Sequence, residues 1–367
     1  MNITRATPES VKATSTPERV PRLHEEPEIL KFVQCDAVQY EGDWDPAKYD
    51  PDLAQSTLHE NLDEAEETER LGFDAILSTE HHFDAWTIIP SPNIYLALVA
   101  ARTTRLRIGQ SVAVLPFHNP WRLAEEAGML DIISNGRMEV GLGKGNFSVE
   151  RETYGLTSVE VDGRFDEGLN LMVNAFKETQ MTFDGKFTRL LRPASLYPKP
   201  FPEMRPWVAT RRVEAAEDLG RAGYNLYGSL VGAQKGNHLE HYLRGAQEAG
   251  HSRSGANYLV SASIIVAPTD AEAARLQERA RETAKDVMQR RGLGEQELMA
   301  YLPLFSGGIC GSPEKVLNEL GEGLQSCGAR RLHLTMRMRF MPRDVFRQTR
   351  ELFATEVMPH LRHLPLP

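Results

Sequence analysis

An acid and two histidines, Glu80, His81 and His82, follow the apolar run 73–78 and could carry out acid–base chemistry. Histidine titrates near neutral pH, which suits it to general acid or base catalysis. Successive residues of a strand point to opposite faces, so a regular strand cannot direct both histidines into one pocket. The three residues also fit a simpler interpretation, as polar residues at the end of a strand. A metal site has less support, because no further histidine or carboxylate lies at ligand spacing.

Two other segments combine backbone N–H groups with positive charge, as an anion-binding site requires. Gly141–Gly145 is a glycine-rich turn that contains Lys144, where N–H groups and an ammonium could meet a phosphate. It matches neither a Walker motif nor a complete dinucleotide fingerprint. Thr210, Arg211 and Arg212 stand at the expected start of a helix, where the helix dipole adds to their hydroxyl and guanidinium groups. The simpler interpretations are an ordinary turn for Gly141–Gly145 and a solvated helix start for residues 210–212.

These side chains can act together only if the elements before them bring them to one side of the fold. Apolar runs typical of strands alternate with segments of helical spacing. The expected strands are 29–35, 73–78, 106–115, 138–142, 207–210, 224–230, 258–267 and 332–336. The expected helices are 51–71, 91–103, 120–133, 162–178, 211–222, 239–249, 269–291, 312–325 and 342–361. This alternation predicts an α/β fold with a parallel sheet, a single (β/α)8 TIM barrel whose strand ends meet at one mouth.

The barrel domain is expected to cover residues 28–367, with insertions near 181–206 and 292–308. The first insertion carries a hairpin signal around Gly185. Residues 1–27 are polar, rich in proline and lack the apolar segment of a secretory signal. We expect them to form an extended N-terminal arm, which is either disordered or laid over the barrel or a neighbouring subunit.

Composition excludes several classes of partner. The net charge is −9 and no long basic block occurs, so nucleic acid is not an expected partner. Three scattered cysteines argue against a disulfide framework or a zinc site and favour reduced thiols in a cytoplasm. No apolar run approaches the about 18 residues that a membrane helix needs. We therefore expect a cytoplasmic protein without a metal, a nucleic acid or a membrane partner.

Taken together, the motifs resemble the bacterial luciferase-like family of flavin-dependent monooxygenases. The matching pieces, in the family's order, are 80–83, 108–120, 124–137 and 141–145. The resemblance implies a barrel that binds reduced FMN (FMNH2), delivered by a separate flavin reductase. The reduced flavin would react with O2 to give a C4a-(hydro)peroxyflavin, which oxygenates an organic small molecule by hydroxylation or Baeyer–Villiger insertion. It also implies a homodimer and leaves the substrate open.

The resemblance further implies roles for individual residues, with His81 on the family's catalytic histidine. The residues expected to bind the cofactor are Glu80, Ser111, Val112, Lys144, Asn146, Thr210, Arg211, Arg212 and Ser229. Ser111–Val112 falls where the family often has a cis peptide. Lys144 falls on a phosphate-binding arginine and keeps its charge but not its bidentate geometry. Gly143 takes the place of the reactive cysteine of the luciferase subunit, which argues against bioluminescence.

A substrate pocket is expected at the mouth of the barrel. Tyr40 and Trp44 lie in an aromatic loop after the first strand and are candidates for its lining, together with His82 and His118. An ordinary surface loop is the alternative. The insertion at 292–308 falls where the family carries a mobile active-site loop. Two other functions remain open, namely F420-dependent hydride transfer by the same fold and a non-catalytic flavin-binding subunit.

Overall fold

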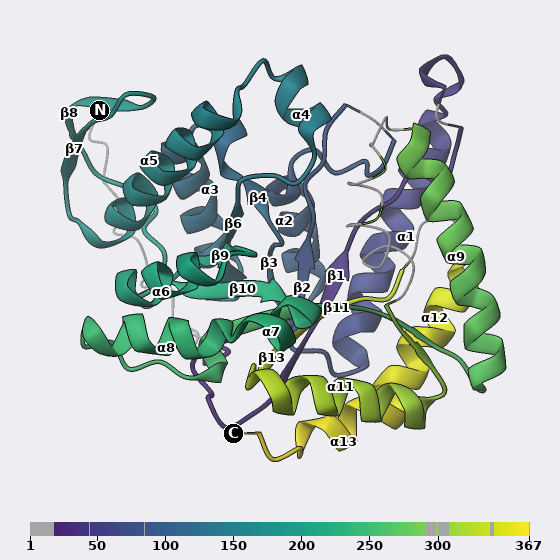
Figure 1. The fold of residues 1–367 in the computed structure, drawn as a ribbon. Coiled ribbons are helices and arrows are strands. Elements are labelled where there is room, and N and C mark those ends of the chain that lie inside the picture. Colours follow the sequence, from purple (N-terminus) through teal and green to yellow (C-terminus); the bar gives the residue numbers. More distant parts are fainter. Residues whose placement is uncertain are drawn as a thin grey trace, which may run out of the picture.

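The computed structural model describes residues 18–43, 45–83, 85–290, 295, 299, 308–337 and 341–366. In this part of the chain, helices surround a curled parallel sheet (Figure 1). Its strands are β1 (Lys31–Asp36), β2 (Ala75–Ser78), β3 (Arg107–Gln110), β4 (Ala113–Val114), β5 (Met138–Glu139), β6 (Gly141–Gly143), β9 (Trp207–Ala209), β10 (Asn225–Ser229), β11 (Tyr258–Val266), β12 (Ile309–Gly311) and β13 (Arg331–Thr335). Each strand that the sequence predicts is present.

The sheet order is β4-β6-β9-β10-β11-β13-β1-β2-β3-β5, and β12 pairs with β11 outside this order. The pairings are parallel, so the carboxyl ends of the strands lie at one edge. The third and fourth predicted strands are interrupted at Ser111–Val112 and at Val140, and β3 pairs with β5 while β4 pairs with β6. The peptide bond between Ser111 and Val112 is cis.

The helices are α1 (Pro51–Arg70), α2 (Pro92–Arg102), α3 (Pro120–Ile133), α4 (Ser148–Thr153), α5 (Ser158–Lys177), α6 (Val213–Ala222), α7 (Leu230–Gly236), α8 (His238–Glu248), α9 (Asp270–Arg290), α11 (Pro313–Cys327), α12 (Arg343–Leu352) and α13 (Met358–Arg362). Asn119 caps α3, because its side chain accepts hydrogen bonds from the first backbone N–H groups. The sequence did not predict α4, α7 or β12, which are too short to show a period. The last predicted helix, 342–361, is divided by a π-turn at Phe353–Val357.

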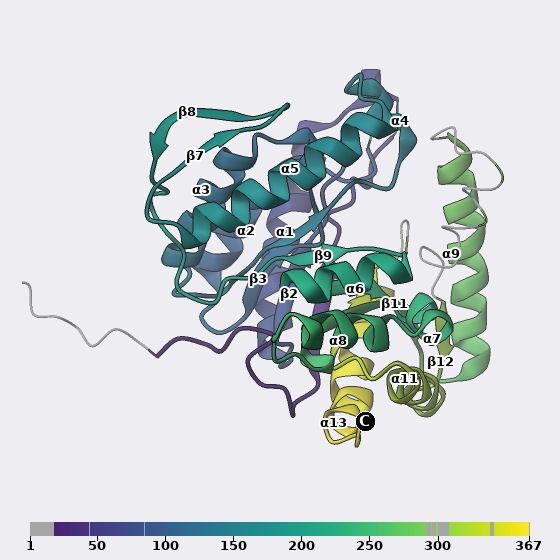
Figure 2. The ribbon, with the colours of Figure 1, turned by 60° about the vertical axis from the view of Figure 1, so that its left-hand side comes forward.

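A separate antiparallel hairpin, β7 (Met181–Asp184) and β8 (Arg189–Ala194), confirms the hairpin predicted around Gly185. It lies beside α5 in both views (Figures 1 and 2). The carboxylate of Glu167 on α5 accepts the backbone N–H groups of Lys186 and Phe187 in the hairpin turn, at 2.7 and 3.0 Å. The hairpin is therefore attached to the outside of the helical layer.

Neighbouring residues of β1 pack into different cores. Phe32 belongs to the main core between the sheet and the helices, whereas Val33 belongs to a small inner cluster with Leu23. This is the alternation expected of a strand that is buried on both faces. Leu23 precedes the first strand, so the chain before β1 helps to fill the inside of the curled sheet.

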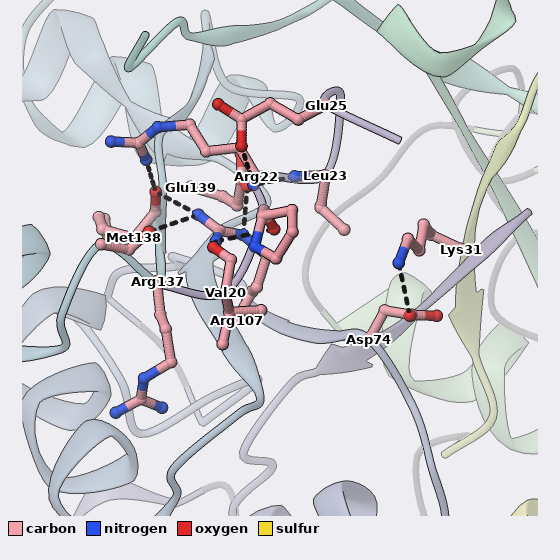
Figure 3. A network of polar contacts seen from close by, with 12 residues as sticks. Val20, Arg22, Leu23, Glu25, Lys31, Asp74, Arg107, Arg137, Met138 and Glu139 are labelled. Atoms are coloured by element: carbon pink, nitrogen blue, oxygen red, sulfur yellow. Dashed lines mark hydrogen bonds and ion pairs between the residues drawn. The ribbon is translucent and has the colours of Figure 1, made fainter. Parts of the chain in front are cut away.

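Residues 18–30, here called the N-terminal plug, lie across the amino ends of the strands (Figure 3). Arg22 is 4% exposed, and its guanidinium forms an ion pair with Asp131 at 3.0 Å. It also donates hydrogen bonds to the carbonyl oxygens of Met138 and Phe201, at 2.9 and 3.1 Å. The described part of the predicted arm, 18–27, is thus held against the sheet.

Glu139 joins the N-terminal plug to several strands. Its carboxylate accepts hydrogen bonds from Arg107 at 2.5 Å, from the backbone N–H of Leu23 at 2.9 Å and from Trp207 Nε1 at 2.8 Å. Burial alone would raise the pKa of the Glu139 carboxyl, but the nearby positive charges, Arg107 foremost, hold this pKa at about 2. The carboxylate therefore stays ionised inside the fold.

We expect Arg22→Ala to lower the free energy of unfolding by about 3–5 kcal/mol, because it leaves the buried Asp131 carboxylate without its cation. Arg102→Ala is the matched control, since it removes an ion pair with the largely exposed Asp63 and should cost at most about 1 kcal/mol. Urea unfolding followed by circular dichroism measures both. Equal losses for the two variants would contradict a stabilising role for the plug.

Candidate functional site

The two adjacent histidines after β2 contact different carboxylates. His81 Nδ1 lies 3.0 Å from Oε1 of Glu150 on α4, and the same oxygen accepts the backbone N–H of His82 at 3.1 Å. His82 Nε2 lies 2.9 Å from Oε1 of Glu80. The ring of Phe147 packs 5.3 Å from that of His81, centroid to centroid. The opposite directions of the histidines agree with the alternation expected at a strand end.

Glu80 is buried and connects three segments around the end of β2. Its carboxylate accepts hydrogen bonds from His118 Nε2 at 2.9 Å, from His82 Nε2 and from the backbone N–H of Val114 at 3.2 Å. Burial would raise the pKa of Glu80, but the hydrogen bonds from the two histidines outweigh it and hold the pKa at about 2. His82 and His118, predicted as pocket residues, are therefore bound to the predicted flavin-contacting acid.

Aromatic rings surround His82. The ring centroids of Phe83, Phe117 and Tyr154 lie 5.8, 5.9 and 5.4 Å from the His82 ring. The Tyr154 hydroxyl is 3.3 Å from His82 Nδ1. Phe83 is 56% and Tyr154 41% exposed, so this cluster presents apolar surface beside the histidines.

Glycines let the interrupted strands approach each other closely next to this cluster. A Cβ atom on Gly143 would lie 2.4 Å from Cγ2 of Val112, and one on Gly141 would lie 2.0 Å from the carbonyl oxygen of Gln110. Larger residues would therefore force these strands apart. At the same edge, Ser111 Oγ and Thr79 Oγ1 are buried, and neither meets hydrogen-bond geometry with a partner in the described part of the chain. We call Ser111, Val112, Gly141 and Gly143 the glycine floor.

The structure pairs Lys144 with an acid on α5. Its Nζ lies 2.6 Å from Asp162 Oδ1 and 5.3 Å from the centroid of the Phe165 ring. The ion pair is exposed, with 41% of the lysine and 62% of the aspartate side chain accessible, and such a pair is worth at most about 1 kcal/mol. A phosphate could therefore replace Asp162 as the partner of Lys144 at little cost. Asn146 follows in the same turn and is exposed.

The predicted helix start at residue 211 is wrong by two residues, since α6 begins at Val213. Thr210 Oγ1 accepts the backbone N–H of Arg212 at 3.1 Å, and Arg212 has extended backbone angles. This local hydrogen bond keeps the segment 210–212 out of the helix. Arg211 and Arg212 are exposed at the carboxyl end of β9, so they still lie beside the N-terminus of α6.

Two other predicted site residues have local structural contacts. Ser229 Oγ accepts the backbone N–H of Gly232 at 3.1 Å and caps α7. Tyr40 is 2% exposed, and its hydroxyl accepts the backbone N–H of Asp50 at 2.8 Å. Its ring also lies 5.4 Å from that of Tyr49, centroid to centroid, so Tyr40 packs within its own loop. Its predicted place in a substrate pocket stays a prediction. Trp44 and most of the insertion 292–308 lie outside the described residues.

Among the described residues, no group of three or more His, Cys, Asp or Glu side chains is arranged to hold a metal ion. No helix in this part of the chain is long and apolar enough to cross a membrane.

Sequence reasoning missed Glu150, which lies 69 residues after His81. No motif surrounds it, and α4 is only six residues long. The one available signal was an acidic residue shortly after the glycine-rich turn, which is too common to single out.

Comparison with known proteins identifies one family. Residues 42–331 match the sequence model of a family described as luciferase-like monooxygenase. The oxygenase component of a flavin-dependent trigonelline monooxygenase from Acinetobacter baylyi is 34% identical over 162 residues, which are 43% of this chain and 44% of that protein. The chain spans about half the length of the curated relatives it matches first, at 49% and 48%.

Solved structures have the same fold. The monooxygenase RslO1 from Streptomyces bottropensis is 26% identical, with a TM-score of 0.77 over 90% of this chain and 99% of that chain. The oxygenating constituent of 3,6-diketocamphane monooxygenase from Pseudomonas putida, a type II Baeyer–Villiger monooxygenase solved with FMN, is 21% identical, with a TM-score of 0.73 over 92% of this chain and 99% of that chain.

We expect His118 to make stability depend on pH. Burial alone would lower the pKa of His118, but the hydrogen bond to Glu80 and its charge raise it above the ordinary 6.5. The stabilisation is therefore fully present below pH 6.5 and is lost as the pH rises through the raised pKa. In His118→Asn, the free energy of unfolding should fall less between acid and alkaline pH than it does in the wild type. Urea unfolding at several pH values measures this difference. The exposed His59 provides the control, His59→Asn; a pH dependence unchanged in His118→Asn would contradict the assignment.

Proposed function

This chain belongs to the luciferase-like monooxygenase family, and we propose that it is a two-component, FMN-dependent monooxygenase that oxygenates an organic small molecule. The observation that carries the proposal is His81, held by the buried Glu150 at the carboxyl end of β2. The carboxyl ends of the strands are where α/β barrels place their chemistry. A closed (β/α)8 barrel is part of the proposal. It is supported because β3 and β4 are consecutive in the chain, as are β5 and β6, yet each of these pairs of strands lies at opposite ends of the sheet order. Hydroxylation and Baeyer–Villiger insertion are the two reaction types in view.

The residues at this edge fit a flavin mononucleotide. The glycine floor has no side chains at Gly141 and Gly143, and the buried hydroxyl of Thr79 at the same edge could bond polar ring atoms. Lys144 and the segment 210–212 supply positive charge for the phosphate. Reduced FMN would supply the activation of O2. His81 would hold or transfer a proton next to the reacting atoms, and the aromatic cluster at His82 would help to exclude water.

The proposal includes two protein partners and a cytoplasmic location. A separate flavin reductase is supported by the relative named as an oxygenase component. A homodimer is supported by apolar side chains exposed on the adjacent helices α2 and α3. They are Ile94, Leu98, Met129, Ile132 and Ile133, with exposed fractions of 71, 52, 54, 43 and 55%. Surface of this kind marks protein interfaces; a monomer in analytical ultracentrifugation would contradict the dimer.

Stopped-flow absorbance tests the proposed function. We expect the protein to delay the return of oxidised FMN when its complex with reduced FMN meets O2. His81→Ala should still bind FMN but lower product formation about 10²–10⁴-fold, the usual contribution of a general acid or base. A variant with undiminished turnover would contradict the role of His81. Reoxidation as fast as that of free reduced FMN, combined with tight F420 binding, would favour the F420-dependent alternative.

Lys144→Ala should weaken the binding of FMN more than that of riboflavin, because only FMN carries a phosphate. Losing one charge-assisted contact of about 1.5–3 kcal/mol corresponds to a roughly 10–150-fold weaker complex. Isothermal titration with both flavins measures the difference. Lys186→Ala is the control, since Lys186 lies in the hairpin turn away from β6. Equal losses for FMN and riboflavin would contradict a phosphate role for Lys144.

A further inference from the structure

The buried carboxyl group of Glu150 contacts both histidines that follow β2. Glu150 is 1% exposed, and one of its oxygens receives both the His82 backbone N–H and His81 Nδ1. Because this oxygen accepts the His82 backbone N–H, it acts as a hydrogen-bond acceptor. His81 therefore carries its proton on Nδ1 when it bonds Glu150, which leaves the basic lone pair of the neutral ring on Nε2.

The neighbouring histidine has the opposite arrangement. His82 Nε2 lies 2.9 Å from the Glu80 carboxylate, so Nε2 must carry the proton. The remaining nitrogen, Nδ1, lies 3.3 Å from the Tyr154 hydroxyl, which can donate to it. Both ring nitrogens of His82 are therefore in use, and protonation of Nδ1 would break the hydrogen bond that Tyr154 donates.

Packing restricts the orientation of the His81 ring and so keeps its Nδ1 directed at Glu150. The rings of Phe147 and Trp86 lie 5.3 and 6.4 Å from the ring of His81 and limit its rotation. The hydrogen bond from the His82 backbone fixes the position of the Glu150 oxygen relative to the turn after β2. Phe147 and Trp86 thus restrict the plane of the His81 ring, and the hydrogen bond to Glu150 determines that the protonated nitrogen is Nδ1.

We infer that Glu150 is a positioning residue that fixes His81 as the Nδ1–H tautomer, while Glu80 fixes His82 as the Nε2–H tautomer. Of the two adjacent histidines, His81 alone then offers a basic nitrogen at Nε2. The inference rests on the proposed function for its purpose, which is to present a single base to the bound flavin and substrate. Its structural content concerns only this chain's own residues.

Nuclear magnetic resonance on the flavin-free protein tests the inference. Long-range ¹H–¹⁵N correlation spectra of ¹⁵N-histidine-labelled protein, recorded at alkaline pH, distinguish the two tautomers. His81→Gln and His82→Gln assign the signals. We expect Nδ1–H for His81 and Nε2–H for His82 in the wild type. An Nε2–H signal for His81 would overturn the inference.

Substitutions at Glu150 test directly whether this residue fixes the tautomer of His81. Glu150→Ala should abolish the Nδ1–H preference of His81 and leave the ring of His82 unchanged. Glu150→Gln should restore it, because the His82 backbone N–H keeps the amide oxygen in the accepting position. Glu152→Ala, on the same helix but with its side chain 68% exposed, is the control and should change neither ring. A wild-type spectrum in Glu150→Ala would overturn the inference.

The outcomes separate this inference from the proposed function. The spectra are recorded without flavin and report the tautomers whether or not the protein oxygenates a substrate. A wild-type protein that shows both expected tautomers but fails the stopped-flow test would contradict the proposed function and support the positioning role. Turnover by a protein whose His81 is in the Nε2–H form would support the proposed function and contradict the positioning role.

Discussion

The buried carboxylate of Glu139 is the interaction on which the rest of the structure depends. It accepts hydrogen bonds from Arg107 at the start of β3, Trp207 at the start of β9 and Leu23 in the N-terminal plug. A carboxylate that is ionised inside a fold must be paired, and removing one partner of such a group is costly. One side chain thus fixes the relative positions of three strands and of the segment that closes their amino ends.

These strands carry the groups of the candidate site at their other ends. β3 leads into Ser111, and β9 leads into Thr210. Because a strand is short and stiff, an arrangement fixed at its amino end is transmitted to its carboxyl end. The plug therefore lies at one edge of the sheet and the histidines lie at the other.

Carboxylates organise both edges, but they bind different partners. At the amino edge, Glu139 and Asp131 pair with arginines, which stay charged at any relevant pH. At the carboxyl edge, Glu80 and Glu150 contact histidines, whose ring nitrogens can donate or accept a proton. The arginine pairs keep their charge, whereas the histidine contacts can take part in proton transfer. This difference in chemistry agrees with a structural edge and a catalytic edge.

The sequence by itself determined the order of the longer strands and helices, because hydrophobic periodicity and caps such as Asn119 are local properties of the chain. It also placed Glu80, His81 and His82 at a strand end. It could not determine that the Tyr40 hydroxyl accepts the backbone N–H of Asp50, or that α6 begins at Val213, because these depend on single hydrogen bonds. Only the tertiary structure decided the partner of each histidine. Glu150 reaches His81 across 69 residues because the folding of α4 over the end of β2 brings them together, and no local pattern encodes a contact of that separation.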